Sequence, residues 1–165
     1  MKGKWTLTLV PALVVIVLDQ LTKALVLARM DLHQSIPLVD GFFALTYVRN
    51  TGAAFGIFAG HDSALRVPAL LAVAALALGV LLWFVRTVPV DRKLVIAACG
   101  AVLGGAIGNM IDRAAYGEVI DFFDVYLGAW HWPAFNVADA AITCGVIVLC
   151  LDALKGEPAV ERSTT

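Results

Sequence analysis

The chain has 165 residues, of which 61% are apolar and 15% are charged, and its mean hydropathy is +0.87. A soluble domain of this size cannot hide so much apolar surface, so the composition predicts a membrane protein and argues against an ordinary soluble enzyme or a disordered chain. The net charge of -1 offers no basic surface to phosphate backbones, so we expect no nucleic-acid partner.

Four apolar segments have the length of membrane-spanning helices, over residues of about 5–28, 67–85, 94–111 and 133–151. The second and third contain no charged residue, whereas Asp19 and Lys23 interrupt the first and Asp139 lies in the fourth. Lys2 and Lys4 before the first segment are typical of a signal peptide, but no small-residue cleavage site follows it, so we expect a retained helix. We therefore predict one domain over residues 1–165, an all-α polytopic membrane protein with four transmembrane helices and a flexible tail at 155–165.

Lysine and arginine near the ends of the spans predict the orientation, because cytoplasmic loops collect basic residues. Seven of them lie on one side of the membrane: Lys2, Lys4, Arg86, Arg92, Lys93, Lys155 and Arg162. Four lie on the other side: Arg29, Arg49, Arg66 and Arg113. We therefore expect both termini in the cytoplasm and the two loops at 30–66 and 112–132 on the outer side.

The first outer loop contains aromatic and β-branched residues from Gly41 to Val48, followed by Asn50-Thr-Gly52. This composition is typical of a strand that ends in a turn. The segment is too long and too apolar for a linker, so we expect it to pack on the membrane surface.

Asp19 and Lys23 lie four residues apart in the first span, so they share one face of a helix and can form an ion pair. Ionisable residues are costly inside a membrane, and pairing lowers that cost. Two interpretations stay open. The pair is either a structural clamp that holds the helix against its neighbours, or it has a chemical role as a proton relay or a lysine base.

The third span carries a ridge of small residues for close helix packing, because Gly100, Gly104 and Gly108 recur at four-residue intervals. The ridge leads into a polar cluster formed by Asn109, Asp112 and Arg113. A polar cluster at the end of a span is either an interface cap or part of a functional site.

Two further acids lie near the outer rim of the membrane. Asp121 is flanked by bulky apolar residues, and Asp139 lies six residues after Pro133, about 9 Å into the fourth helix, with Asn136 one turn before it. If the two carboxylates approach each other, they share one proton and titrate in coupled steps. Such a pair activates water and protonates a leaving group, which is the chemistry of aspartic proteases.

Other catalytic arrangements fit less well. The three histidines are scattered, and the sequence has neither HExxH nor a Cys/His spacing that predicts a zinc site. It has no G-x-S-x-G motif, and a Ser–Lys dyad would need Lys23 to meet a loop serine. We expect no metal and no organic cofactor. The cysteines lie in apolar runs, at Cys99, Cys144 and Cys150, and are expected to be buried free thiols.

Five motifs, taken together, resemble the lipoprotein signal peptidases of bacteria, also called signal peptidase II. The motifs are Asp19-Gln-Leu-Thr-Lys23, Arg49-Asn50-Thr-Gly-Ala-Ala-Phe-Gly56, Gly104-Gly-Ala-Ile-Gly-Asn-Met-Ile-Asp-Arg113, Val119-Ile-Asp121-Phe and Phe135-Asn136-Val-Ala-Asp139. They occur in the order of the family and cover nearly the whole chain.

The resemblance implies a membrane aspartic endopeptidase with four transmembrane helices and a small β-rich extracytoplasmic cradle. Its activity would be removal of the signal peptide from prolipoproteins, by cleavage just before a cysteine that carries a diacylglyceryl group. The implied partners are these prolipoproteins and membrane lipids, and the protein is expected to be a monomer. Its expected location is the bacterial cytoplasmic (inner) membrane, with the active site near the outer leaflet.

The resemblance also implies roles for individual residues. Asp121 and Asp139 would be the catalytic pair. Substrate-binding and site-lining residues would be Asn50, Gly52, Asn109, Arg113 and Asn136. Asp19 and Lys23 would shape the packing of the first span, and neither Asp112 nor Asp124 is expected to take part in catalysis.

Two alternatives belong to other classes of protein. A small proton or solute transporter would use Asp19, Lys23 and Asp139 as a relay, but the acids gather at one rim and do not form a ladder across the membrane. A scaffold protein would use the glycine ridge to bind partner helices. It would leave the two rim acids unexplained.

Overall fold

The computed structural model describes residues 2–52 and 63–154. Four long helices account for most of this part of the chain, namely α1 (Lys2–Arg29), α2 (Ser63–Thr87), α3 (Lys93–Tyr116) and α4 (Val137–Leu154). Each is long and apolar enough to cross a membrane. The predicted fold class of four membrane-spanning helices is thus confirmed. The predicted tail at 155–165 lies outside the described residues.

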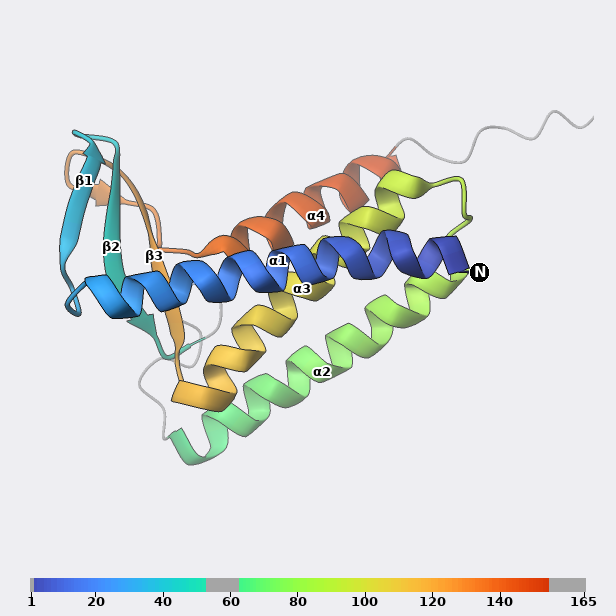
Figure 1. Ribbon diagram of the computed structural model, residues 1–165, viewed down its shortest axis with the longest axis horizontal. Helices are drawn as coiled ribbons and strands as arrows, with labels where there is room; N and C mark the ends of the chain where they lie inside the picture. The colour runs from blue at the N-terminus through green and yellow to red at the C-terminus, as the bar shows by residue number, and fades with distance from the viewer. Residues whose placement is uncertain (1, 53–62, 155–165) are drawn as a thin grey trace, which may run out of the picture.

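Helix α3 is the centre of the bundle, with α1 and α4 packed on it (Figure 1). Its glycines permit this close approach. A Cβ on Gly100 would collide with the backbone of Thr8, and one on Gly104 would collide with the backbone of Ala12. Gly105 approaches the backbone of Ala138 in α4 in the same way. The predicted packing role of the glycine ridge is therefore confirmed.

A four-stranded antiparallel sheet lies at one end of the bundle, opposite the end that carries the N-terminus (Figure 1). Its strands follow the order β1 (Ser35–Val39), β2 (Phe43–Asn50), β3 (Val119–Leu127) and β4 (Trp130–His131). The structure confirms the predicted strand, which ends at Asn50, whereas the turn predicted after it runs into residues outside the described part of the chain. The prediction placed the β-structure in the first loop alone, whereas β3 and β4 come from the second loop.

Residues of β3 alternate between two sides of the strand, as expected for extended backbone. Ile120 and Phe122 are buried in a cluster with Val26 of α1 and Tyr47 of β2. This apolar cluster fixes the sheet on the end of α1. Asp121 therefore projects from the opposite side of β3.

Helix α4 begins at Val137, four residues later than the predicted boundary at about residue 133. The backbone of Phe135 is still paired with Phe123 of β3, so the chain there is extended. Asp139 is consequently in the first turn of α4. The predicted depth of about 9 Å inside the helix was wrong, because it assumed that the helix starts at Pro133.

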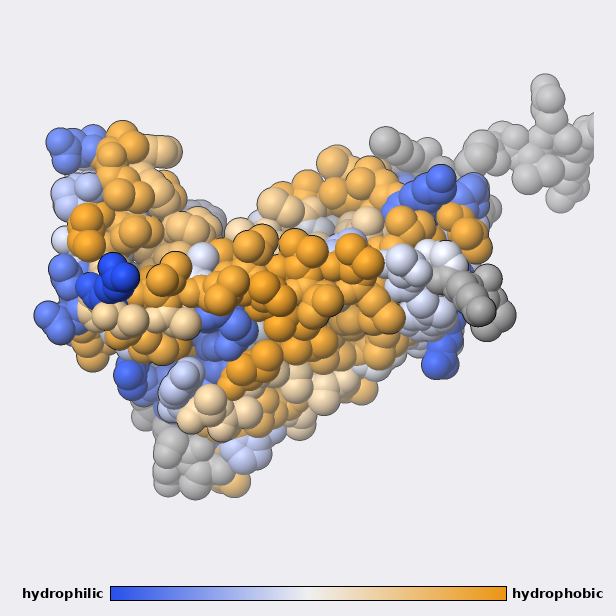
Figure 2. Space-filling view, in the orientation of Figure 1, coloured by the Kyte–Doolittle hydropathy of each residue, from blue (hydrophilic) through white to orange (hydrophobic). Residues whose placement is uncertain are grey.

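The helices expose many large apolar side chains. On the face shown in Figure 2, most hydrophilic residues gather toward the two ends of the bundle. This pattern suits a bundle that is surrounded by lipid. The prediction of three buried thiols is correct only for Cys99. Cys144 and Cys150 are exposed, because α4 buries one narrow face that contains Ala138 and Gly145.

Candidate active site

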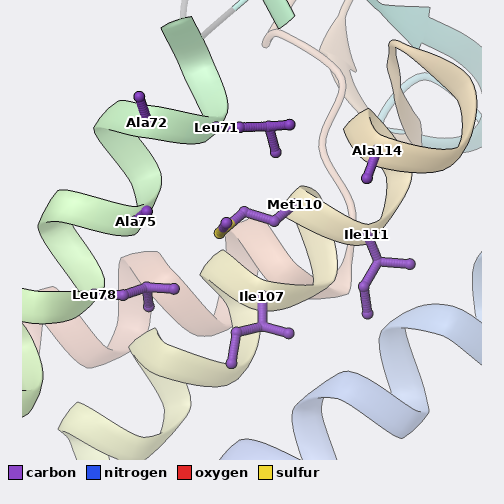
Figure 3. Close-up of a pocket in the computed structure, with 8 residues that line it drawn as sticks. All are labelled: Leu71, Ala72, Ala75, Leu78, Ile107, Met110, Ile111 and Ala114. Carbon is purple, nitrogen blue, oxygen red and sulfur yellow. The ribbon is translucent and has the colours of Figure 1, made fainter. Parts of the chain in front are cut away.

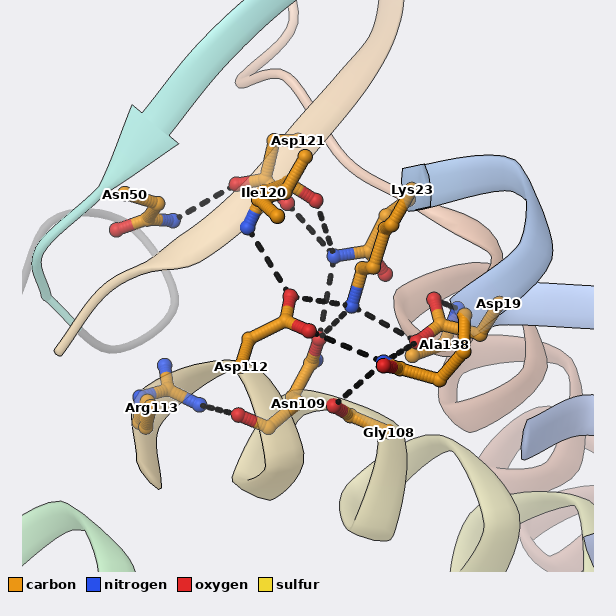
Figure 4. Close-up of polar contacts among 12 residues, drawn as sticks. Asp19, Lys23, Asn50, Gly108, Asn109, Asp112, Arg113, Ile120, Asp121 and Ala138 are labelled. Carbon is orange, nitrogen blue, oxygen red and sulfur yellow. Dashed lines mark hydrogen bonds and ion pairs between the residues drawn. The ribbon is translucent and has the colours of Figure 1, made fainter. Parts of the chain in front are cut away.

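Asp121 is almost fully buried, with 1% of its surface exposed, and amide groups hold both of its carboxylate oxygens. Asn136 donates from Nδ2 to Asp121 Oδ1 at 2.7 Å, and Asn50 donates from Nδ2 to Asp121 Oδ2 at 3.1 Å (Figure 4). Asn50 reaches this position because the end of β2 pairs with the start of β3, where Asn50 lies opposite Val119. The strand pairing thus brings together two residues that are far apart in the sequence.

Asp139 is half-buried and is fixed at the N-terminus of α4 by a reciprocal cap. The backbone N–H of Asp139 donates to Asn136 Oδ1 at 2.9 Å, and the backbone N–H of Asn136 donates to Asp139 Oδ2 at 3.3 Å. This exchange satisfies two backbone donors that the helix leaves free. Asn109 of α3 donates from Nδ2 to Asp139 Oδ1 at 2.8 Å. The Asn136–Asp139 spacing is therefore that of an N-cap and the third helical residue.

The two carboxylates are electrostatically coupled. Burial raises the pKa of Asp121 well above its usual range, the negative charge of Asp139 raises it further, and the resulting pKa is about 7. Two such acids titrate as a pair, so one proton can be shared between them near neutral pH. A protonated acid beside a carboxylate can supply a general acid and a general base at once.

Arg113 and Gly52 close the site at the end of β2. Arg113 donates to the carbonyl oxygen of Gly52 at 2.9 Å, and the backbone N–H of Gly52 donates to Asn50 Oδ1 at 3.0 Å. Arg113 also donates weakly to the carbonyl oxygen of Asn109, at 3.4 Å. All the predicted site-lining residues are thus brought together around Asp121 and Asp139. Residues 53–56 of the same motif lie outside the described part of the chain.

A buried ion cluster lies beneath the site. Lys23 Nζ lies 2.8 Å from Asp19 Oδ2 and 2.7 Å from Asp112 Oδ2, and it donates to Asn109 Oδ1 at 3.1 Å (Figure 4). The predicted pairing of Asp19 with Lys23 is confirmed. Asp112 and Gln20 also belong to this cluster, which the sequence did not predict, although Asp112 shares a helix face with Asn109.

Asp124 lies in the same strand as Asp121 but has other partners. Its carboxylate accepts a hydrogen bond from Thr46 Oγ1 at 3.0 Å and lies 2.8 Å from Nδ1 of His131. These contacts lie within the sheet, whereas Asp121 is held by Asn50 and Asn136. Asp124 is therefore a carboxylate of the same strand that stands apart from the coupled pair.

An apolar groove of about 600 Å³ runs between α2 and α3 beside the site. Figure 3 shows apolar side chains of the two helices facing each other across it, with Met110 of α3 pointing toward α2. The lining residues are Leu71, Ala72, Ala75, Leu78, Ile107, Met110, Ile111 and Ala114. Met110 and Ala114 directly follow Asn109 and Arg113, so the groove adjoins the polar site along α3.

Comparison with known proteins agrees with this geometry. The family described as Signal peptidase (SPase) II matches residues 11–155. The lipoprotein signal peptidase of Geobacter sulfurreducens is 50% identical over 142 residues, which cover 86% of this chain and 88% of the relative. That of Syntrophus aciditrophicus is 44% identical over 155 residues, which cover 94% and 96%. A solved structure of a bacterial membrane enzyme matches with a TM-score of 0.83 at 29% identity, over 96% of this chain and 93% of the other.

Four membrane-length helices and a coupled pair of acids at one end of the bundle are features of a membrane-embedded aspartic peptidase, a multi-pass enzyme of a bacterial membrane. Within that class, the chain belongs to the signal peptidase II family, the lipoprotein signal peptidases. This membership favours the peptidase over the transporter and scaffold alternatives.

Proposed function

We propose that this protein removes the signal peptide from prolipoproteins by cutting just before a diacylglyceryl-modified cysteine, with Asp121 and Asp139 as its catalytic residues. The observation that carries the proposal is the coupling of these two acids. One is buried with a pKa of about 7, and the other lies in the first turn of the neighbouring helix. The match to lipoprotein signal peptidases supports the choice of substrate.

In the proposed reaction, Asp121 carries the shared proton and Asp139 is the base. Asp139 takes a proton from a water molecule as the water attacks the scissile carbonyl, while Asp121 donates a hydrogen bond to the carbonyl oxygen. Breakdown of the tetrahedral intermediate breaks the C–N bond, and Asp139 returns its proton to the leaving amine. The products are a new carboxyl group and a new amino terminus, and both aspartates regain their starting state.

The amide side chains around the pair orient the carboxylates for this reaction. Asn50 and Asn136 hold Asp121, and Asn109 holds Asp139. Arg113 and Gly52 line the entrance at the end of β2 and bind the substrate backbone. Fixed donors of this kind cost no reorganisation when charge develops in the transition state.

The lipid part of the substrate is assigned to the groove between α2 and α3. All the residues that line the groove are apolar, as an acyl chain requires. Met110 and Ala114 connect this groove to Asn109 and Arg113 of the polar site. A lipid-anchored peptide can then present its modified cysteine to the site while its acyl chains stay in an apolar environment.

The whole chain is proposed to be one monomeric domain of the cytoplasmic membrane, with both termini in the cytoplasm. The charge count across the loops supports this orientation. The sheet lies at the bundle end opposite the N-terminus (Figure 1). With the termini in the cytoplasm, the cradle and the active site would face the outer leaflet.

The experiment that tests this function uses the purified full-length protein in detergent. A prolipoprotein that carries the diacylglyceryl group is incubated with it, and the products are identified by mass spectrometry. We expect a single cut before the modified cysteine, at an equal rate with and without a metal chelator. The same prolipoprotein without the lipid should remain intact. Cleavage at another bond, or equal cleavage of both substrates, would contradict the proposal.

A further inference from the structure

The backbone N–H groups just before Asp121 and Asp139 are both bound by the buried ion cluster. The N–H of Ile120 donates to Asp112 Oδ2 at 3.1 Å, and the N–H of Ala138 donates to Asp19 Oδ1 at 3.0 Å (Figure 4). Asp19 comes from α1 and Asp112 from α3. The residue before each proposed catalytic acid therefore donates a backbone hydrogen bond to a carboxylate, and the two carboxylates come from different helices.

Two side chains of α1 join these carboxylates to each other. The ammonium group of Lys23 contacts Asp19 at 2.8 Å and Asp112 at 2.7 Å. Gln20 Nε2 donates to Asp19 Oδ2 at 3.2 Å and to Asp112 Oδ1 at 3.0 Å. A continuous path of short contacts thus runs from Ile120 through the cluster to Ala138.

The free-energy cost of burying these charges argues that the cluster does more than hold the helices together. The side chains of Asp19, Lys23 and Asp112 are at most 2% exposed. Three buried charges carry a large desolvation penalty, and well-packed apolar residues often serve packing equally well. A clamp between α1 and α3 also gives no reason why both carboxylates bind backbone N–H groups beside Asp121 and Asp139.

We propose that Asp19, Lys23 and Asp112 form a positioning frame that sets the separation between the carboxyl groups of Asp121 and Asp139. The frame rests on the proposed function in that it takes these two acids as the catalytic pair. Lys23 has a second role in the same frame. Together with Asn136 Nδ2, it donates to Asn109 Oδ1, so that Asn109 Nδ2 faces Asp139. Neither Lys23 nor the two framing acids touches the substrate.

The matched variants Asp112→Ala and Asp112→Asn test the frame. Both remove the same charge, but asparagine keeps an oxygen that can accept from Ile120 and Lys23. We expect Asp112→Ala to lower kcat about 100-fold with little change in KM, because misplacement by about 1 Å costs that much. Asp112→Asn should recover at least about tenfold of that loss. Equal kcat values in the two folded variants would overturn the frame.

Gln20→Ala keeps the test usable if Asp112→Ala does not fold, because it leaves no buried charge without a partner. It removes one of the two links between Asp19 and Asp112. We expect kcat to fall about threefold at unchanged KM. An unchanged kcat in folded Gln20→Ala protein would count against the frame.

A titration that needs no catalysis separates the frame from the proposed function. The carboxylic-acid band of Asp121 is followed by infrared spectroscopy against pH, and Asp121→Asn identifies the band. The charges around it are Asp139, Lys23 and Arg113, which both Asp112 variants retain. The titration midpoint should be lower in Asp112→Ala than in Asp112→Asn, because separation from Asp139 weakens the coupling. Equal midpoints overturn the frame. Wild-type protein that fails to cut prolipoprotein while the midpoints differ overturns only the function.

Discussion

The side chain of Asn136 contacts Asp121 and Asp139 at the same time. Its Nδ2 donates to Asp121 Oδ1 at 2.7 Å, and its Oδ1 accepts the backbone N–H of Asp139 at 2.9 Å. One residue thus caps α4 and holds a strand of the sheet. The residue that caps α4 is therefore also the residue that holds Asp121 next to the start of that helix.

The pH dependence of cleavage follows from the raised pKa of Asp121. Below a pH of about 7 this acid holds its proton, and above it the proton is lost. We expect kcat/KM to fall as the pH rises through about 7, because the general acid disappears. This fall is measured from initial rates on the lipidated substrate over a range of pH at fixed ionic strength. A flat profile from pH 6 to 9 would show that Asp121 is not the group that must be protonated.

The raised pKa of Asp121 should also make the stability of the folded protein decrease as the pH rises. The pKa of Asp121 is raised from 3.8 to about 7, so the folded state binds more protons than the unfolded state between these values. Its favourable contribution is complete below pH 4 and is lost as the pH rises through about 7. Asparagine does not titrate, so Asp121→Asn should gain thermal stability relative to wild type as the pH rises from 5 to 8. A Tm difference that is constant with pH would contradict the raised pKa.

Replacing glycine by alanine should affect stability differently inside and outside the glycine ridge. In Gly104→Ala the new Cβ would lie against the backbone of Ala12, whose Cα would be only 2.9 Å away, so α1 and α3 must separate. We expect Gly104→Ala to lower the free energy of unfolding by about 1–3 kcal/mol. Gly79→Ala in α2 meets no atom within 4 Å and should be neutral or stabilising by up to about 1 kcal/mol. Thermal unfolding in detergent compares them, and equal destabilisation by both would argue against close packing at the ridge.

The assignment of the acyl chain predicts a change in KM. Ala75 lines the groove between α2 and α3, whereas Ala77, two residues along α2, is exposed and does not line it. Filling the groove in Ala75→Trp should raise KM by roughly tenfold because apolar contact with the lipid is lost. Ala77→Trp is the control for adding a tryptophan to α2. If the two variants have the same KM, the acyl chain binds elsewhere.

Much of the site could be predicted from the spacing of polar residues in the sequence. The four-residue step from Asp19 to Lys23 predicted an ion pair, and the three-residue step from Asn136 to Asp139 placed both on one side of α4. The first is a contact within α1, and the second is the cap at the N-terminus of α4. Both are local, so sequence distance fixes spatial distance. Asn109 and Arg113 were singled out as a polar cluster at the end of the third span, and the resemblance to a known family assigned them, together with Asn50, to the site.

The parts that were missed depend on contacts between elements. Whether α4 starts at residue 133 or at Val137 is decided by the pairing of Phe135 with Phe123, which no local signal predicts. The second loop adds β3 to the sheet through pairing with β2, a contact between distant segments. Asp112 was interpreted as part of a polar cluster at the end of the third span. Its ion pair with Lys23 was not predicted, because Lys23 lies in another helix.

The most direct test of the acid pair is the activity of three single variants on the lipidated substrate. Asp121→Asn and Asp139→Asn preserve the shape of the side chain but cannot act as acid or base. Asp124→Asn is the matched control from the same strand, since Asp124 binds Thr46 and His131 and lies outside the pair. We predict that the first two lose cleavage by at least about 1000-fold while they remain folded, and that the third stays near the wild-type rate. Near-wild-type cleavage by folded Asp121→Asn or Asp139→Asn would contradict the central claim.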